Sequence, residues 1–210
     1  MPLRYRARWS CLVIELVLLR HGESVWNAEH RYQGQQGTGL SARGRQQAKQ
    51  AAEYLQSFEF DAIVASDLQR VTETLQPYVD TLDQPSVRID RRWREIDVGT
   101  WGGRLIAEVA AEEPDVVEAF ARGEDIARGG GETFRQLRAR VWEAMQAIAH
   151  ADVRRVLVVT HGGPIRVAAA AALGLPVGAE MVLDPPGNCS LTRLRLDGLT
   201  AYNVPTGMDR

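Results

Sequence analysis

The sequence predicts an α/β protein, a three-layer α/β/α sandwich with a mostly parallel central sheet. Short apolar segments with the length of buried strands occur at residues 14–19, 61–65 and 153–160. Between them lie segments whose apolar residues recur with helical spacing. This alternation is typical of a parallel sheet that is covered by helices on both faces.

A single domain is expected over residues 14–205, because a chain of 210 residues suits one hydrophobic core. Its 45% hydrophobic and 25% charged residues are ordinary for a globular protein. The net charge of -2 gives no overall attraction to nucleic acid or to an anionic membrane, so neither is expected as a partner. Any anion site must therefore come from a local cluster of basic groups.

Residues 1–13 are expected to be an N-terminal extension without a defined structure. Basic residues precede the apolar run at 11–19, which superficially resembles a secretory signal. However, Glu15 interrupts the run and no small-residue cleavage site follows it. The run is also shorter than the about 20 residues that cross a bilayer. A cytoplasmic location is therefore expected.

In the first half of the chain, the buried strand at 14–19 is followed by a stretch rich in Gly and Gln at 22–40, which predicts loops. Ser41 is a suitable N-cap for a helix that runs to about Leu55. The second strand, at 61–65, precedes a further helix.

The helix after the second strand is expected to begin near Asp67, whose side chain is a suitable N-cap rather than a catalytic acid. Pro77 is expected to end or kink this helix, because proline lacks the backbone N–H. A short third strand is predicted at 86–89.

The second half contains a section rich in Gly, Ala and Glu at 100–130, where we expect two short helices and a loop inserted over one end of the sheet. Apolar residues from 134 to 148 form a helical stripe. The strand at 153–160 precedes a helix from about 164 to 173. Alternating residues at 191–196 predict a late strand at the edge of the sheet.

Cysteines and histidines give no sign of a metal centre. Cys11 and Cys189 form no CxxC pair, so neither a zinc site nor a disulfide framework is expected. The four histidines contain no ligand pair of the HExxH type. We expect His30 and His150 to be structural, and the tryptophans at positions 26, 93, 101 and 142 to be packing residues.

Basic and imidazole side chains follow the ends of separate predicted strands. Arg20 and His21 end the first, and His161 ends the strand at 153–160. Arg70 lies about one turn into the helix after the second. Ligands of open α/β sheets bind beyond the carboxyl ends of the strands, so these side chains are expected to converge on one anion.

The motifs around these residues resemble those of one family. Residues 19–27, Leu-Arg-His-Gly-Glu-Ser-Val-Trp-Asn, are similar to the signature of the histidine phosphatase superfamily, also called phosphoglycerate mutase-like. The matching segments occur in the family's order, so chance is a poor explanation. The others are 33–34, 40–41, 44, 47–48, 66–70, 74, 94–96, 99, 101–103, 130–133 and 160–166.

The resemblance implies a phosphohistidine mechanism. It assigns His21 as the nucleophile, Glu95 as the general acid and His161 as a catalytic residue that also binds phosphate. The further residues that it assigns to phosphate binding are Arg20, Arg70, Asn27 and Gly34. It places Gln33 and Glu132 near the substrate, and it implies no metal and no cofactor, because the arginines neutralise the phosphate.

The chain departs from the family pattern at Gly37 and Gly39, where an Asp and a Pro are common, and at Gly102-Gly103, where Glu-Gly is common. These differences are expected to affect substrate access. Pro77 is also unusual for the family.

We favour a phosphomonoesterase of small phosphorylated metabolites. The alternatives are a cofactor-dependent phosphoglycerate mutase and, with less support, a non-catalytic protein that binds phosphorylated ligands. A homodimer is common in the family, but no interface can be identified in the sequence.

Overall fold

A computed structural model describes residues 14–195 and 198–207. Within these residues, six strands form one sheet in the order β3-β2-β4-β1-β5-β6. The first four strands in this order are mutually parallel, whereas β5 runs antiparallel to β1 and to β6. The strands are β1 (Glu15–Arg20), β2 (Ala62–Ala65), β3 (Val87–Ile89), β4 (Arg155–Thr160), β5 (Ser190–Arg195) and β6 (Gly198–Pro205).

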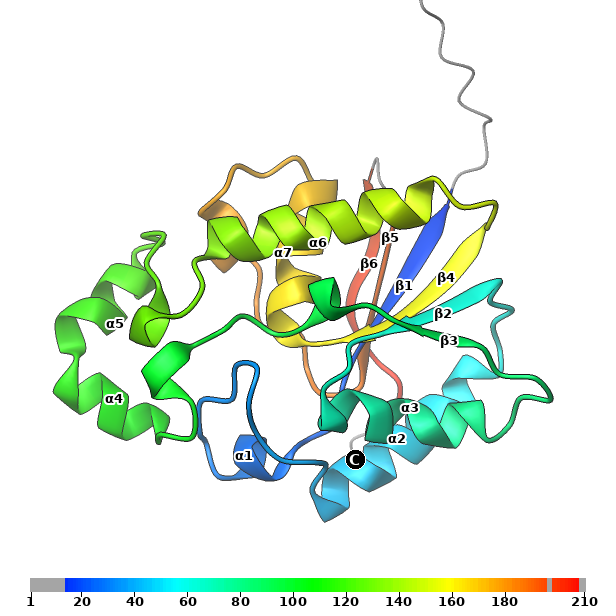
Figure 1. Cartoon of the computed structure of the whole chain (residues 1–210), viewed down its shortest axis with the longest axis horizontal. Helices are drawn as coiled ribbons and strands as arrows, with labels where there is room; N and C mark the ends of the chain where they lie inside the picture. The colour runs from blue at the N-terminus through cyan, green and yellow to red at the C-terminus, as the bar shows by residue number, and fades with distance from the viewer. Residues whose placement is uncertain (1–13, 196–197, 208–210) are drawn as a thin grey trace, which may run out of the picture.

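Helices cover both faces of the sheet, so the expected three-layer α/β architecture is confirmed (Figure 1). One face is covered by α2 (Ala42–Leu55) and α3 (Gln69–Val79), and the other by α6 (Phe134–Ala149) and α7 (Gly162–Ala172). The remaining helices are α1 (Val25–Ala28), α4 (Ile106–Glu112) and α5 (Pro114–Ala121). Short 3-10 turns are η1 (Arg91–Trp93), η2 (Gly99–Trp101), η3 (Arg128–Gly130) and η4 (Ala179–Val182).

The two layers of core follow from the alternation of side chains along the central strands. Leu16 and Leu18 of β1 pack into the cluster that contains α6 and α7. Val17 and Leu19 pack into the opposite cluster, which contains α2 and α3. Strand β4 alternates in the same way. Because both faces are buried, the two strands read as continuous apolar runs in the sequence.

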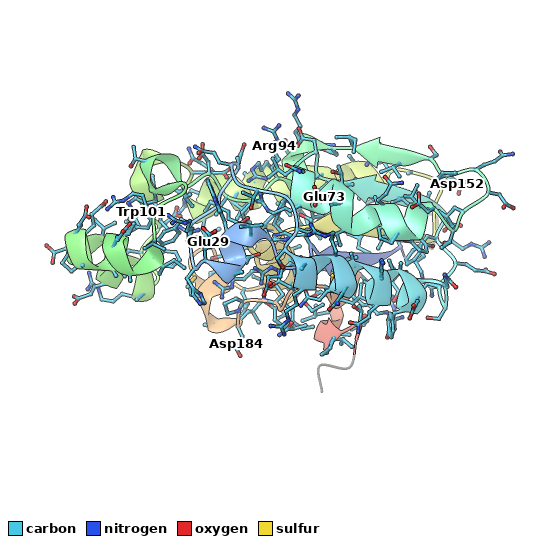
Figure 2. All side chains as sticks on the ribbon, turned by 90° about the horizontal axis from the view of Figure 1, so that it is seen from below. Glu29, Glu73, Arg94, Trp101, Asp152 and Asp184 are labelled. Carbon is cyan, nitrogen blue, oxygen red and sulfur yellow. The ribbon has the colours of Figure 1, made fainter. Side chains whose placement is uncertain are left out.

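Helices α4 and α5 form a unit to one side of the sheet (Figure 1). They match the two short helices expected within 100–130, and Pro114 is the first residue of α5, where its missing N–H costs nothing. Viewed from below, Trp101 lies towards this end of the molecule and Asp152 at the opposite end (Figure 2).

Some expectations about the elements were wrong. Pro77 was expected to end or kink α3, but the helix continues through it to Val79. A proline in the last turn removes only one helical hydrogen bond. The N-cap of α3 is Leu68 and not Asp67, since the Asp67 carboxylate accepts hydrogen bonds from Arg94 instead. Trp93 and Trp101 are buried as expected, but Trp142 is 38% exposed.

Two elements were missed. The four-residue helix α1 forms within the Gly- and Gln-rich stretch, where the side chains of Ser24 and Asn27 cap its start reciprocally. Strand β6 occupies the edge of the sheet, so β5 lies one position inside the edge that was predicted for it. Register shifts between β5 and β6, together with the positive φ of Asn203, obscure the alternation of β6.

The parallel pairing brings the carboxyl ends of β1, β4 and β2 to one edge of the sheet. Hydrogen bonds join these ends directly. The His21 N–H donates to the Thr160 carbonyl at 3.0 Å, and the Ser66 N–H donates to the Val159 carbonyl at 3.1 Å. Three distant segments are thereby held within contact of one another.

The expected N-terminal extension, residues 1–13, lies outside the described residues. Within 14–195 and 198–207, none of the helices has both the length and the apolar character that a membrane crossing requires.

Gly44 lies in the first turn of α2 against the backbone of Glu23, two residues after His21. A methyl group at this position would overlap the Glu23 carbonyl oxygen. We expect Gly44→Ala to lower the free energy of unfolding by about 1–3 kcal/mol, despite the better helix propensity of alanine. Urea denaturation measures this change. Gly198→Ala is the control, because no atom lies within 4 Å of its added methyl; equal losses in both variants would contradict the packing argument.

Candidate active site

His21 is buried at the end of β1, with 2% of its surface exposed. Its Nδ1 lies 2.7 Å from the carbonyl oxygen of Gly22, and its Nε2 lies 3.3 Å from Nε of Arg70. Because a carbonyl oxygen only accepts and a guanidinium only donates, Nδ1 carries the hydrogen and Nε2 carries the lone pair. Burial, with the charges of Arg70 and Arg20, holds the pKa of His21 well below its usual 6.5. The imidazole is therefore neutral at pH 7.

His161 follows β4 and is fully buried. Its ring centroid lies 5.1 Å from that of His21, with the planes inclined by 62°. Its Nε2 lies 2.9 Å from the Ser66 hydroxyl, which fixes the ring, whereas Nδ1 has no hydrogen-bond partner among the described residues. Burial and the charge of Arg70 hold the pKa of His161 well below its usual range.

Two guanidinium groups lie beside this pair. Arg70 donates through NH1 to the Gln36 carbonyl and through NH2 to the Gly34 carbonyl, both at 2.8 Å, and through Nε to His21. These contacts use three of its five N–H groups and leave two for a ligand. Burial lowers the pKa of Arg70 to about 10, so it keeps its charge.

Arg20 donates through NH1 to the Pro186 carbonyl, and its buried Nε has no partner within the described part of the chain. Burial also lowers the pKa of Arg20, although the charge of Glu95 opposes that shift. An unpaired N–H on a buried cation is costly without an acceptor. A bound oxyanion would supply that acceptor.

Glu95 lies at the N-terminus of α7. Its Oε1 accepts from the Gly163 N–H at 3.1 Å and from the Ile96 N–H at 2.8 Å. The end of the helix favours a carboxylate at this position. A side chain on Gly163 would overlap Oε1 of Glu95, so this glycine allows the close approach.

A second layer of arginine contacts fixes the Glu95 segment. Arg140 of α6 donates to the carbonyl oxygens of Arg92 and Arg94 at 2.7 Å and of Glu95 at 2.9 Å. Glu132 holds Arg140 through two hydrogen bonds of 2.7 Å. Glu132 does not line the cavity that contains His21, so the structure does not place it where substrate contact was expected. It positions Arg140.

Asn27, Gln33 and Gly34 line the same cavity as His21. Oδ1 of Asn27 accepts from the Ser24 N–H at 3.2 Å, which leaves the amide hydrogens as donors. Oε1 of Gln33 accepts from the Ser24 hydroxyl at 2.7 Å. Gly34 has a φ of 54°, and any side chain on it would clash with Val98.

These groups surround a cavity of about 420 Å³. Of the nine residues predicted for the site, Arg20, His21, Asn27, Gln33, Gly34, Arg70 and Glu95 line it. His161 lies behind His21 without lining the cavity. Sequence reasoning missed its outer lining, which includes Arg31, Tyr32, Ile106, Phe120, Arg128, Phe134, Arg166, Met181 and Pro185. Most of these follow or belong to the inserted helices, and among them only Arg166 lies within a matching segment, 160–166.

One departure from the family pattern, Gly37, lies against Trp26 together with Gly103. Trp26 packs against Gly37 and Gly103, whose added methyl groups would each lie 3.2 Å from its ring. Both glycines have positive φ, at 113° and 83°, which alanine tolerates poorly. Gly39 lies against the Glu73 carboxylate, which accepts from the Leu40 N–H at 2.7 Å. Trp26 is therefore a packing residue, as expected.

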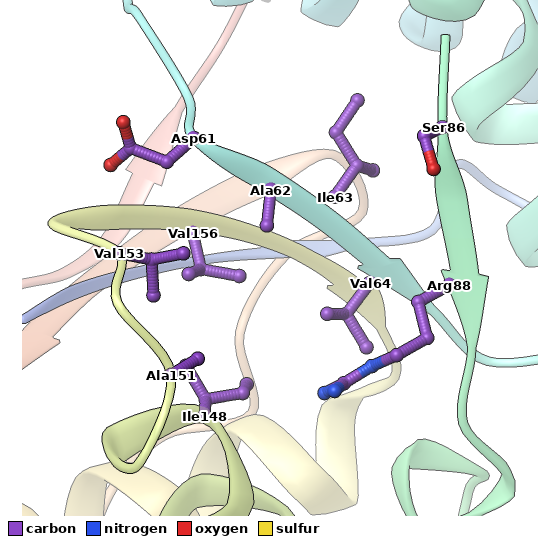
Figure 3. A pocket seen from close by; sticks show the side chains of 10 residues that line it. All are labelled: Asp61, Ala62, Ile63, Val64, Ser86, Arg88, Ile148, Ala151, Val153 and Val156. Atoms are coloured by element: carbon purple, nitrogen blue, oxygen red, sulfur yellow. The ribbon is translucent and has the colours of Figure 1, made fainter.

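A second cavity of about 170 Å³ lies near the start of β2 (Figure 3). Its walls are largely apolar, with Ile63, Val64 and Ile148 among the lining residues. The Asp61 carboxylate at its mouth already accepts from the N–H groups of Arg154 and Arg155, at 2.7 and 2.8 Å. This cavity lies far along the strands from His21 and offers no matching chemistry.

Comparison with known families agrees with this geometry. The sequence model of the histidine phosphatase superfamily (branch 1) matches residues 16–202. The chain therefore belongs to the histidine phosphatase superfamily, and it is an enzyme of the phosphatase type.

Relatives include both phosphatases and mutases. The chain is 39% identical to a glucosyl-3-phosphoglycerate phosphatase of Mycolicibacterium vanbaalenii, over 89% of this chain and 88% of that protein. It is 33% identical to a probable phosphoglycerate mutase GpmB of Erwinia tasmaniensis, over 87% and 85% of the two chains. A mycobacterial glucosyl-3-phosphoglycerate phosphatase solved with VO3 superposes with a TM-score of 0.83 at 35% identity, covering 91% of this chain and 99% of that one.

The lowered pKa values of His21 and His161 predict a pH-dependent stability. Both histidines bind a proton more readily in the unfolded chain, whose usual pKa is 6.5, than in the fold. Stability is therefore complete above that value and declines as the pH falls below it, by up to about 1.4 kcal/mol per pH unit for each histidine. Paired carboxylates such as Asp67 stabilise the fold throughout this range and lose their contribution only below about pH 4, because their pKa values are lowered from 3.8.

Urea unfolding between pH 7.5 and 5 in phosphate-free buffer measures this decline. His161→Asn should flatten it, whereas His150→Asn should leave it unchanged, because His150 is exposed. An equal decline in the wild type and in His161→Asn would show that the buried imidazole is not its source.

Proposed function

We propose that the protein hydrolyses small phosphomonoesters through a phosphohistidine on His21. The observation that carries the proposal is the state of His21: a neutral imidazole with no hydrogen on Nε2, in a cavity that Arg20 and Arg70 also line. Nothing but a phosphoryl or similar electrophilic oxyanion suits both the nucleophile and the two cations. The relatives named as phosphatases of glucosyl-3-phosphoglycerate support a small phosphorylated metabolite as substrate. We further propose a cytoplasmic enzyme, and a homodimer stays a prediction.

In the first step, the hydrogen bond from Nε of Arg70 shifts from Nε2 of His21 to a phosphate oxygen, which frees the lone pair. Nε2 then attacks phosphorus and the bond to the leaving oxygen breaks. The Gly22 carbonyl, which accepts the hydrogen on Nδ1, stabilises the positive charge that develops on the ring. Arg20, Arg70 and the amide of Asn27 donate to the non-bridging oxygens, where the charge of the transition state is spread. His161 does not line the cavity, but its unpaired Nδ1 and its ring, 5.1 Å from that of His21, make it the neighbouring group that we expect to stabilise the phosphorylated His21.

Glu95 is suited to transfer the proton. In its acid form it protonates the leaving alkoxide as the phosphorus–oxygen bond breaks. As a carboxylate it then removes a proton from water, which attacks phosphorus and breaks the phosphorus–nitrogen bond. Inorganic phosphate leaves and His21 returns to its neutral form. The N–H groups of Gly163 and Ile96 bind the carboxyl group, and Arg140 binds the backbone carbonyl of Glu95. These contacts hold the carboxyl group in one place for both transfers.

His21→Ala is expected to lower phosphatase activity by at least about 10³-fold, because it removes the atom that forms the phosphoenzyme. It should also form no acid-labile phosphoenzyme in an acid quench with a ³²P-labelled phosphomonoester. Glu95→Gln is the matched control: it keeps the nucleophile and should still be phosphorylated by p-nitrophenyl phosphate, whose leaving group needs little protonation. Normal turnover by a folded His21→Ala protein would refute the proposed mechanism.

A phosphoglycerate mutase is the second candidate, because several relatives carry that name. The phosphatase is favoured by the higher identity, 39% against 33%, and by the close structural neighbours with phosphatase names. The chemical difference between the two is the fate of the phosphoenzyme. A mutase returns the phosphoryl group to the substrate, whereas a phosphatase gives it to water.

The two activities can be separated in one reaction. We expect incubation with 3-phosphoglycerate to release inorganic phosphate with no more than a trace of 2-phosphoglycerate, and p-nitrophenyl phosphate to be hydrolysed as well. Phosphate release by a dye assay and isomer formation by NMR give both rates. Isomerisation that is much faster than phosphate release would reverse the choice, and activity on neither compound across pH 5–8 would favour a non-catalytic binding protein.

A further inference from the structure

The cavity is lined by a cation, Arg128, that forms no ion pair with a carboxylate of the described residues. The guanidinium carbon of Arg128 lies 4.5 Å from the ring centroid of Phe120 and 5.4 Å from that of Phe134. The two rings are themselves stacked at 5.9 Å and 25°. One face of the guanidinium is therefore held against an aromatic surface, which fixes its plane and leaves its edge for hydrogen bonds.

The hydrogen-bonding capacity of Arg128 is unused. Its Nε is buried without a partner, and Arg128 takes part in none of the ion pairs found among residues 14–195 and 198–207. Burial lowers the pKa of Arg128, and the positive charge of Arg166 lowers it further. Glu95 and Tyr32 oppose this shift without contacting the guanidinium closely enough to form an ion pair.

Arg166 is a second cation of the same kind. It lies in α7, is only 8% exposed, and donates through NH1 to the Met181 sulfur at 3.1 Å. It also hydrogen-bonds Tyr202, and no described carboxylate pairs with it. Arg31, by contrast, is compensated by Glu29 at 2.7 Å. Two arginines of the cavity thus have neutral partners only.

Buried cations that repel each other are unfavourable unless an anion is supplied. The transferring phosphate serves this purpose only in part: Arg166 acts on the charge of Arg20 as well as on that of Arg128, whereas neither Arg20 nor Arg70 acts on Arg128. The cavity is large enough for more than one functional group of a small ligand, since typical sites begin at about 300 Å³.

From this we infer that the substrate is a phosphomonoester whose leaving group carries a second oxyanion, a carboxylate or a second phosphate, which Arg128 and Arg166 bind. The inference rests on the proposed phosphatase function and names its substrate class. The forked donors of arginine match both oxyanions. Phe120, Phe134 and Ile106 supply apolar walls for the carbon skeleton between the two anionic groups.

The wild-type enzyme tests this with matched substrates. Glycerol 3-phosphate and 3-phosphoglycerate differ by a hydroxymethyl group in place of a carboxylate, and glucose 6-phosphate and glucose 1,6-bisphosphate differ by one phosphate. We expect kcat/KM to be about 10- to 100-fold higher for the anionic member of at least one pair. The pair that shows the preference identifies the second oxyanion. Equal values within both pairs would overturn the inference.

Arg128→Gln should then bring that ratio close to one, mainly through KM for the anionic substrate. Arg122→Gln, an exposed arginine that pairs with Glu118 and Glu124, is the control and should leave the ratio unchanged. If Arg128→Gln slows both members of a pair equally, the residue is structural and the inference fails. Failure of the wild type to hydrolyse p-nitrophenyl phosphate as well would instead mean that the proposed phosphatase function is wrong.

Discussion

Arg70 donates its Nε hydrogen to Nε2 of His21, and both side chains are buried. A guanidinium can hold this position only beside a neutral imidazole, so the contact sets the protonation state on which the site depends. Helix α3 supplies a second tie to the same loop, because Thr74 lies four residues after Arg70, on the same face. Its hydroxyl accepts from the Gly22 N–H at 2.9 Å, while the Gly22 carbonyl faces Nδ1 of His21. One helix thus positions both the imidazole and the loop that orients it.

The acid side of the site depends on arginines that do not touch the cavity centre. Arg94 is held by Asp67, directly after β2, and Arg140 is held by Glu132. Between them they fix the backbone on either side of Glu95. The Thr160 hydroxyl adds a hydrogen bond of 2.6 Å to the Trp93 carbonyl, so β4 contacts the same segment. Nucleophile and carboxyl group are consequently carried by one rigid sheet edge.

The sequence was sufficient to predict the strands and helices whose apolar residues follow a regular pattern. Strands β1, β2 and β4 are buried on both faces and read as apolar runs, and Ser41 caps α2 as expected. Helix α1 was missed because its stability comes from reciprocal side-chain caps in a polar stretch, and β6 because bulges interrupt its alternation.

The inner site was predictable because strand ends place its residues and family motifs mark them. No role could be assigned in the same way to Arg128, or to Arg166, although Arg166 ends the matching segment 160–166. Their surroundings depend on how the inserted helices and η4 pack over the cavity. The spacing of residues along the sequence does not predict that packing. Glu132 is the opposite case. Its motif suggested substrate contact, but in the structure its carboxylate pairs with Arg140.

The strand order also determines when the site can form during synthesis. Strand β4 lies between β1 and β2, although it is the last of the three to be made. Glu15 and Arg155, which mark the starts of β1 and β4, are 140 residues apart in the chain. A nascent chain that stops before β4 contains His21 and Arg70, but it has no strand to hold them at one edge. Contacts over such distances form slowly and late. The parallel part of the sheet and the anion site are therefore completed together, and a chain that stops before β4 presents no finished site to phosphate.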